Sequence, residues 1–137
     1  MITGWLDRDY LTLFDDQIEA IQKTQEYGIT DVIANFTLIG LISWDDFILK
    51  DKNGAIFSVP TVPLDQQFLK PINLVIDQTK IKADSSIQDK IKWYIQPIVF
   101  GGSPTSNENI AWIDIEQHIQ AVRFWNQKYK MIKGNEG

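Results

Sequence analysis

The chain has 137 residues, 44% of them hydrophobic and 23% charged, which is the size and composition of one folded domain and excludes a disordered chain. It contains no cysteine, which excludes disulfides, thiolate metal sites and a cysteine nucleophile, and which indicates a reducing compartment. The net charge is −5, and an acidic chain is poorly suited to nucleic acid, because phosphate backbones select basic surfaces.

The charge is unevenly distributed along the chain. Residues 1–66 carry 11 acidic and 4 basic side chains, a net charge of −7, whereas residues 67–137 carry 7 acidic and 9 basic side chains, a net charge of +2. An acidic half can steer a basic protein partner toward itself. A general contribution to solubility is the simpler interpretation.

The sequence also bears on localisation. It opens with MITGWLDRDY, which lacks the cationic and apolar character of a leader peptide. The longest apolar run, residues 32–44, has 13 residues, whereas a membrane-spanning helix needs about 20. We therefore expect a cytoplasmic protein without a membrane partner.

Residues 10–27 are predicted to form the first element, an amphipathic helix. Its polar side carries Asp15 and Asp16, and Gly28 provides a C-terminal stop. Its apolar side, assigned to the core, comprises Leu11, Leu13, Phe14, Ile18 and Ile21.

Two short segments follow this helix. Thr30 or Asp31 can cap a second, shorter helix that continues to residue 36. Residues 37–43 are so uniformly apolar that periodicity does not distinguish a buried strand from a helix.

The stretch WDDFILKDKNGAIFSVP contains the strongest hairpin signal of the chain. Asn53 and Gly54 both tolerate the positive φ of a type I′ turn, and we predict strands at residues 47–51 and 55–59. The alternative is a helix over residues 43–54, because a serine at its start is followed three positions later by an acid, as in a capping box.

The chain leaves this hairpin through Pro60 and Pro63, which end strand pairing. Short strands are then predicted at residues 73–77 and 79–82. Both runs contain β-branched residues and are bounded by polar segments.

Residues 91–95 alternate between apolar and polar side chains, which predicts a half-buried strand. A helix over residues 86–96 matches the apolar spacing as well and stays open. Further strands are expected at residues 98–100 and 110–113, on either side of the loop at residues 101–109.

The last element is predicted to be a helix. Asp114, with Gln117 three residues later, forms a capping-box-like start, and Gly134 is expected to end the helix. The elements together predict a single α+β domain, residues 1–137, with terminal helices packed on an antiparallel sheet of about four to six short strands.

The stretch FGGSPTSNENIAW, residues 100–112, invites comparison with a phosphate-binding loop. Such loops need converging backbone N–H groups and, as a rule, a lysine after the last glycine. Pro104 removes one donor, and no lysine follows before Lys128. We therefore interpret Gly101 and Gly102 as a tight connection between strands.

Candidate catalytic residues are few. The pairs Asp15-Asp16 and Asp45-Asp46 are adjacent in sequence, so their side chains diverge, and solvated acids are the favoured interpretation. His118 is the only histidine. Without cysteines or a GxSxG motif it is interpreted as a packed structural residue, and the sequence predicts no catalytic residue, metal site or cofactor.

Two stretches resemble a known family. IVFGGSPTSNENIAWID, residues 98–114, is similar to a strand–loop–strand unit of the SUKH superfamily of bacterial toxin-immunity proteins, and WDDFILKDKNGAIFSVP resembles the meander of such small α+β proteins. The resemblance covers about a third of the chain. It implies a non-enzymatic antitoxin that binds and blocks a co-produced toxin.

The expected function is therefore an immunity-type protein that occludes the active site of a basic cognate toxin. Four residues are the predicted partner-binding surface, because they combine an aromatic side chain with acids: Trp44, Asp45, Asp46 and Asp51. The alternatives are a small enzyme or ligand-binding domain that uses His118 and acidic residues, and an assembly component.

Overall fold

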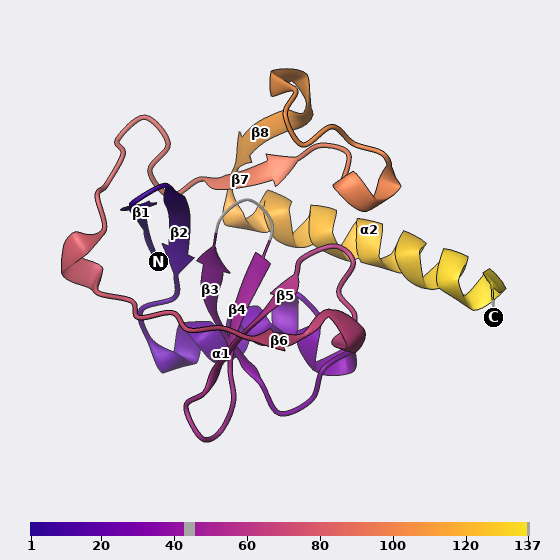
Figure 1. Ribbon diagram of the computed structural model, residues 1–137, viewed down its shortest axis with the longest axis horizontal. Coiled ribbons are helices and arrows are strands. Elements are labelled where there is room, and N and C mark those ends of the chain that lie inside the picture. The colour runs from indigo at the N-terminus through magenta and orange to yellow at the C-terminus, as the bar shows by residue number, and fades with distance from the viewer. Residues whose placement is uncertain (43–45, 137) are drawn as a thin grey trace.

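In the residues that the computed structural model describes, 1–42 and 46–136, the chain forms a six-stranded sheet, a separate two-stranded sheet and two α-helices (Figure 1). All strand pairs are antiparallel, and the large sheet follows the order of the sequence from β1 to β6. The predicted α+β class is confirmed. The strands are β1 (Ile2–Leu6), β2 (Asp9–Leu13), β3 (Thr37–Ile42), β4 (Asp46–Lys50), β5 (Ile56–Pro60), β6 (Lys70–Pro71), β7 (Ile91–Tyr94) and β8 (Ile110–Ile113), and the helices are α1 (Gln17–Glu26) and α2 (Ile115–Glu136).

The core lies between one face of the large sheet and the two helices. Phe47 and Leu49 alternate along β4 and are both fully buried. They belong to the same apolar cluster as Ala20 of α1 and Val122 of α2. Both helices therefore cover the same face of the sheet.

The N-terminal prediction was wrong in part. Residues 2–13 form the β1–β2 hairpin, and α1 begins at Gln17, where the carboxylate of Asp16 accepts a hydrogen bond of 2.7 Å from the backbone N–H of Glu19. The predicted apolar stripe combined strand residues with helix residues. As a result Ile18 and Ile21, which were assigned to the core, are 72% and 45% exposed.

The centre of the chain follows the prediction more closely. Gly28 ends α1 with a φ of 74°, but the helical segment after it is only a 3₁₀ turn at Ile29–Asp31. Residues 37–42 form a strand, and β4 and β5 confirm the hairpin against the helical alternative.

The turn of that hairpin differs from the predicted type I′. Gly54 has a φ of 87°, and its N–H donates to the carbonyl of Asp51 at 3.1 Å. The carboxylate of Asp51 accepts from the backbone N–H groups of Asn53 and Ala55, each at 2.9 Å. The aspartate thus organises a turn in which glycine supplies the left-handed residue.

The segment between the two sheets forms fewer strands than predicted. Residues 73–77 form none, and residues 79–82 yield only a 3₁₀ turn at Gln78–Lys80 and a bridge from Lys82 to Trp5, with two backbone hydrogen bonds of 2.8 Å. β7 is confirmed as a strand. It is buried at all four positions instead of alternate ones, because α2 and β8 pack against it.

The glycine-rich loop is held by its own side chains. Residues 98–100 form a 3₁₀ turn and not the predicted strand. Nδ2 of Asn109 donates to the carbonyls of Gln96 and Ser103 at 3.0 and 2.9 Å, and its Oδ1 accepts from the N–H of Gln96 at 2.8 Å. These bonds support the interpretation of the loop as a structural connection between two segments. They leave no set of free N–H groups at Asn109 that could bind a phosphate.

The start of α2 confirms the predicted capping box. The N–H of Gln117 donates to the carboxylate of Asp114 at 2.8 Å, and the N–H of Asp114 donates to the side chain of Gln117 at 3.1 Å. The helix does not end at Gly134 but continues to Glu136. Its last turns extend beyond the sheet (Figure 1).

Candidate functional site

The candidate site lies between α1 and the turn that joins β4 to β5. Two hollows of about 470 and 390 Å³ adjoin each other here and share Thr37, Lys50, Asp51 and Lys52 in their walls. The first hollow reaches the N-terminal end of α1, and the second runs along the helix. We call them together the α1 groove, which is lined on the helix side by Asp15, Asp16, Ile21 and Gln25 and on the sheet side by Thr37, Lys50, Asp51 and Lys52.

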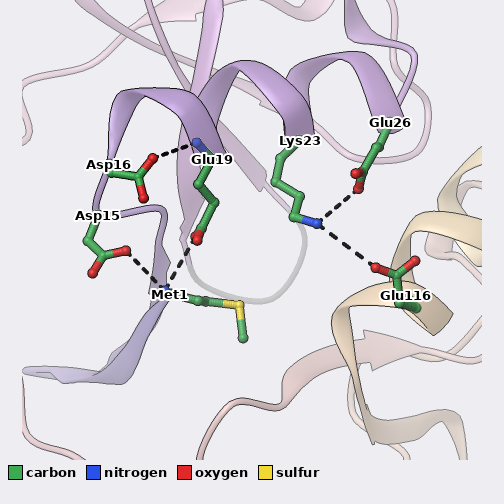
Figure 2. A network of polar contacts seen from close by, with 7 residues as sticks. All are labelled: Met1, Asp15, Asp16, Glu19, Lys23, Glu26 and Glu116. Carbon is green, nitrogen blue, oxygen red and sulfur yellow. Dashed lines mark hydrogen bonds and ion pairs between the residues drawn. The ribbon is translucent and has the colours of Figure 1, made fainter.

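The N-terminal end of α1 carries three carboxylates, Asp15, Asp16 and Glu19 (Figure 2), of which Asp15 and Asp16 line the groove. The N-terminal ammonium of Met1 lies 3.0 Å from Asp15 and 3.3 Å from Glu19. Its hydrogen bond to Asp15 lowers the pKa of that carboxyl. Asp16 caps the helix instead, whereas Asp15 and Glu19 share the ammonium.

A second set of ion pairs joins α1 to α2. Nζ of Lys23 lies 2.9 Å from Glu26 and 3.9 Å from Glu116 (Figure 2). Arg123 of α2 donates to the carbonyl of Glu26 at 2.8 Å, which satisfies an orphan carbonyl at the end of α1. The helix that forms one wall of the α1 groove is therefore fixed against the other helix.

Of the four predicted partner-binding residues the structure describes two, Asp46 and Asp51, and these two do not lie together. Trp44 and Asp45 lie outside the described residues. Asp46 begins β4 and Asp51 follows its end, so at about 3.3 Å per residue the two lie about 16 Å apart. Only Asp51 lines the α1 groove.

Asp46 also differs from a solvated acid. It is half-buried, and this burial raises the pKa of its carboxyl, while the charge of Lys70 acts in the opposite direction. Its half-buried position makes Asp46 less accessible to a partner than the prediction assumed.

The residues of α1 that line or flank the groove, unlike Asp46, were not predicted as site residues, for two reasons. Asp15 and Asp16 were interpreted only as solvated acids, although Asp16 followed by Glu19 three residues later is a helix-start signal. Ile18 and Ile21 were placed in the core because their spacing continues that of the preceding strand. Placing the helix start at Asp16 would have separated them from β2.

The cluster of Asp15, Asp16 and Glu19 brings three carboxylate oxygens within 4.8 Å of one another. In the described residues two of these acids pair with the N-terminal ammonium and the third caps α1. Each carboxylate thus has a partner within the chain, and we assign no metal to them; three carboxylates and one ammonium leave this end of α1 with a net charge of −2.

His118 is a structural residue, as the sequence-based interpretation favoured. It is 1% exposed, its Nδ1 lies 2.7 Å from the hydroxyl of Tyr27, and its ring meets that of Trp93 edge-on at 5.2 Å. Burial lowers the pKa of His118 to about 3. It is therefore neutral at physiological pH and inaccessible to a substrate.

Within the described parts of the chain, no helix has the length and apolar character that crossing a membrane requires. Comparison of the sequence with models of protein families and with curated proteins, and of the structure with solved structures, gave no match. The resemblance to the SUKH superfamily accordingly stays a prediction.

Proposed function

We propose that this protein is a binding protein of the immunity type, which neutralises a cognate bacterial toxin in the cytoplasm by docking over its active site. The α1 groove is the docking surface in this proposal. It replaces the surface predicted around Asp46, which is half-buried.

The observation that carries the proposal is the convergence of Asp15, Asp16 and Asp51 on the same hollow. Exposed Ile18 and Ile21 lie on the adjoining turns of α1. Apolar side chains beside charged groups are characteristic of protein interfaces, because burial supplies affinity and charge supplies orientation.

The charges of the groove define the partner further. Lys50 and Lys52 line the same hollows as the three acids, so the groove presents both signs. The N-terminal end of α1 is its acidic end. A toxin whose active-site cleft presents cations there, with an apolar side chain opposite Ile21, complements it.

The test uses the protein encoded by the neighbouring reading frame as the partner. Its affinity for the wild-type chain is measured by calorimetry, and its toxicity is measured with and without co-expression. Ile21→Lys is expected to weaken binding about tenfold or more, because it removes apolar contact and adds a like charge. Asp51→Asn keeps the turn acceptor but removes the charge, and is expected to weaken binding a few-fold at low salt.

Glu108→Gln is the matched control, because it removes an exposed acid from the loop before β8, away from the α1 groove. It is expected to bind like the wild type. Equal affinities for the wild type and Ile21→Lys would show that the groove is not the docking surface. No binding and no protection by the wild type would reject the immunity function itself.

A further inference from the structure

The turn between β4 and β5 contains two groups that can react with each other, the side-chain amide of Asn53 and the backbone nitrogen of Gly54. Of the seven asparagines in the chain, Asn53 is the one that glycine follows. The other six precede larger residues: Asn35, Asn73, Asn107, Asn109, Asn126 and Asn135. Because glycine has no Cβ atom, its backbone nitrogen can approach the preceding side chain with less steric hindrance than that of any other residue.

Both groups are accessible to water. Asn53 and Gly54 are exposed, and so are Lys52 and Ala55 on either side of them. Within the described part of the chain the side-chain amide of Asn53 makes no hydrogen bond, whereas its backbone N–H donates to the carboxylate of Asp51. The amide is therefore free to rotate toward the nitrogen of Gly54.

The closed turn restrains that nitrogen. The N–H of Gly54 donates to the carbonyl of Asp51 at 3.1 Å. The N–H groups of Asn53 and Ala55 donate to the carboxylate of Asp51, each at 2.9 Å. A backbone nitrogen must lose its proton before it attacks a carbonyl carbon, so these bonds have to open first. All paired residues of β4 and β5 lie outside residues 51–55, and the turn can therefore open without separating the strands.

We propose that Asn53 is a site of spontaneous deamidation, and that opening of the turn organised by Asp51 controls its rate. In the open turn the nitrogen of Gly54 loses its proton to solvent and attacks Cγ of Asn53. The bond from Cγ to the side-chain nitrogen breaks, and that nitrogen takes up a proton and leaves as ammonia. Water then opens the resulting cyclic imide. The reaction consumes water, releases ammonia and needs no oxidant or reductant.

The ring can open in two directions, and both products carry a new carboxylate. The net charge of residues 50–53 therefore changes from +1 to 0. Opening in one direction gives aspartate. Opening in the other gives isoaspartate, in which the main chain passes through the former side chain and is longer by a methylene group. This insertion follows the N–H of residue 53 and precedes those of Gly54 and Ala55, so it displaces the bonds of the latter two to Asp51.

The modified turn borders the α1 groove, because Lys50, Asp51 and Lys52 line the sheet side of that groove. The deamidation does not depend on the proposed function, since the reaction needs only the turn and water. Failure of the toxin-binding test would leave this inference intact. An unreactive Asn53 would likewise leave the docking surface intact.

The first test is ageing of the purified chain in mildly alkaline buffer, followed by peptide mapping with mass spectrometry. The peptide that contains Asn53 is expected to change from amide to acid several-fold faster than a peptide that contains any other asparagine. Its products are expected to co-elute with synthetic aspartate and isoaspartate standards. Conversion of Asn53 no faster than that of the other asparagines overturns the proposal.

Asp51→Ala tests the control by the turn. It removes the carboxylate that accepts from Asn53 and Ala55, and is expected to raise the rate about tenfold because the turn opens more often. Asp77→Ala is the matched control, since it removes a carboxylate that accepts from the N–H of Thr79 in a 3₁₀ turn. It is expected to leave the rate at Asn53 unchanged.

The variants and the wild type are compared well below their melting temperatures, so that global unfolding does not contribute to the rates. A rate in Asp51→Ala equal to that of the wild type would show that the turn does not control the reaction.

Asn53→Gln is the control for the chemistry. The longer side chain would have to close a larger ring, and the amide that it replaces makes no hydrogen bond in the described structure. The variant is expected to melt like the wild type and to stay intact under conditions in which Asn53 converts. Conversion of the same peptide at the wild-type rate in Asn53→Gln would place the reaction at another residue and reject Asn53 as the site.

Discussion

The hydroxyl of Tyr27 lies 2.7 Å from Nδ1 of His118, and both groups are buried. Tyr27 is the residue at which α1 ends, and His118 lies in the first turn of α2. The ring of Tyr27 also meets that of Phe47 edge-on at 5.0 Å. One polar contact therefore connects the two helices and the sheet at the centre of the core.

Stability should fall in mildly acidic solution because of His118. Its pKa is lowered from 6.5 to about 3 in the folded chain, so between these values the unfolded chain binds a proton that the folded chain excludes. The contribution is fully present above about pH 6.5 and is lost as the pH falls, with a slope of up to about 1.4 kcal/mol per pH unit. Urea unfolding at a series of pH values measures this slope.

His118→Gln is the control for that slope, because glutamine does not titrate. The variant is expected to lose most of the pH dependence between about pH 6.5 and pH 5. Comparison with the wild type separates the contribution of His118 to the pH dependence of stability from that of Asp46. The raised pKa of Asp46 makes stability change with pH in the opposite direction. Parallel pH profiles for the two proteins would contradict the assignment.

Tyr27→Phe should destabilise the fold without changing its packing. The variant keeps the ring contact with Phe47 but leaves the buried Nδ1 of His118 without its hydroxyl partner. The cost of such an unpaired buried group is about 1–3 kcal/mol, measurable by urea unfolding. A double mutant with His118→Gln tests the pair: an additive effect would show that the two side chains do not interact.

Asp65 should stabilise the last turns of α2 in a pH-dependent way. Lys133 and Tyr129 both donate to its carboxylate, and the hydrogen bond with Lys133, followed by bonds from Gln67 and Tyr129, lowers the pKa of Asp65 to about 2. This contribution is present above the unfolded pKa near 3.8 and is lost as the pH falls toward 2. We expect Asp65→Asn to cost about 1 kcal/mol at neutral pH.

Hydrogen exchange locates this effect. In Asp65→Asn the amides of the last turns of α2 should exchange faster, while those of β4 should be protected as in the wild type at matched stability. Uniform loss of protection would instead assign Asp65 to the global fold. Asp77→Asn is the comparison variant, because Asp77 caps a 3₁₀ turn in the same manner, by accepting from the N–H of Thr79, on the segment between β6 and β7.

Elements that depend on neighbouring residues were predictable from the sequence. The Asn53-Gly54 hairpin and the Asp114–Gln117 capping box are defined by residues within a few positions of each other, and both are present. The start of α1 was predicted wrongly, because Tyr10 to Phe14 match the spacing of a strand and of a helix equally well and the capping signal of Asp16 and Glu19 was not used.

The candidate site was beyond prediction for a different reason. Asp15 and Asp51 are far apart in sequence and line the same hollow only because α1 packs beside β3 and β3 pairs with β4. Spacing along the chain contains no information about such a contact. The exposure of Ile18 and Ile21 was not predicted for the same reason, because the sequence alone does not show which side of α1 meets the sheet.

Gly102→Ala should be among the most damaging single substitutions in the glycine-rich loop. A Cβ atom at Gly102 would lie 1.8 Å from the carbonyl oxygen of Gln96 and 2.8 Å from Nδ2 of Asn109. Because both atoms belong to the hydrogen-bonded unit that forms the loop, the backbone must move, at a cost of about 2 kcal/mol or more. Gly134→Ala is the matched control: a Cβ there meets no atom within 4 Å, and in a helix alanine is favoured over glycine by up to about 1 kcal/mol. Thermal melting of the two variants should therefore shift in opposite directions, and an undamaged Gly102→Ala variant would contradict the tight packing of Gly102 against Gln96.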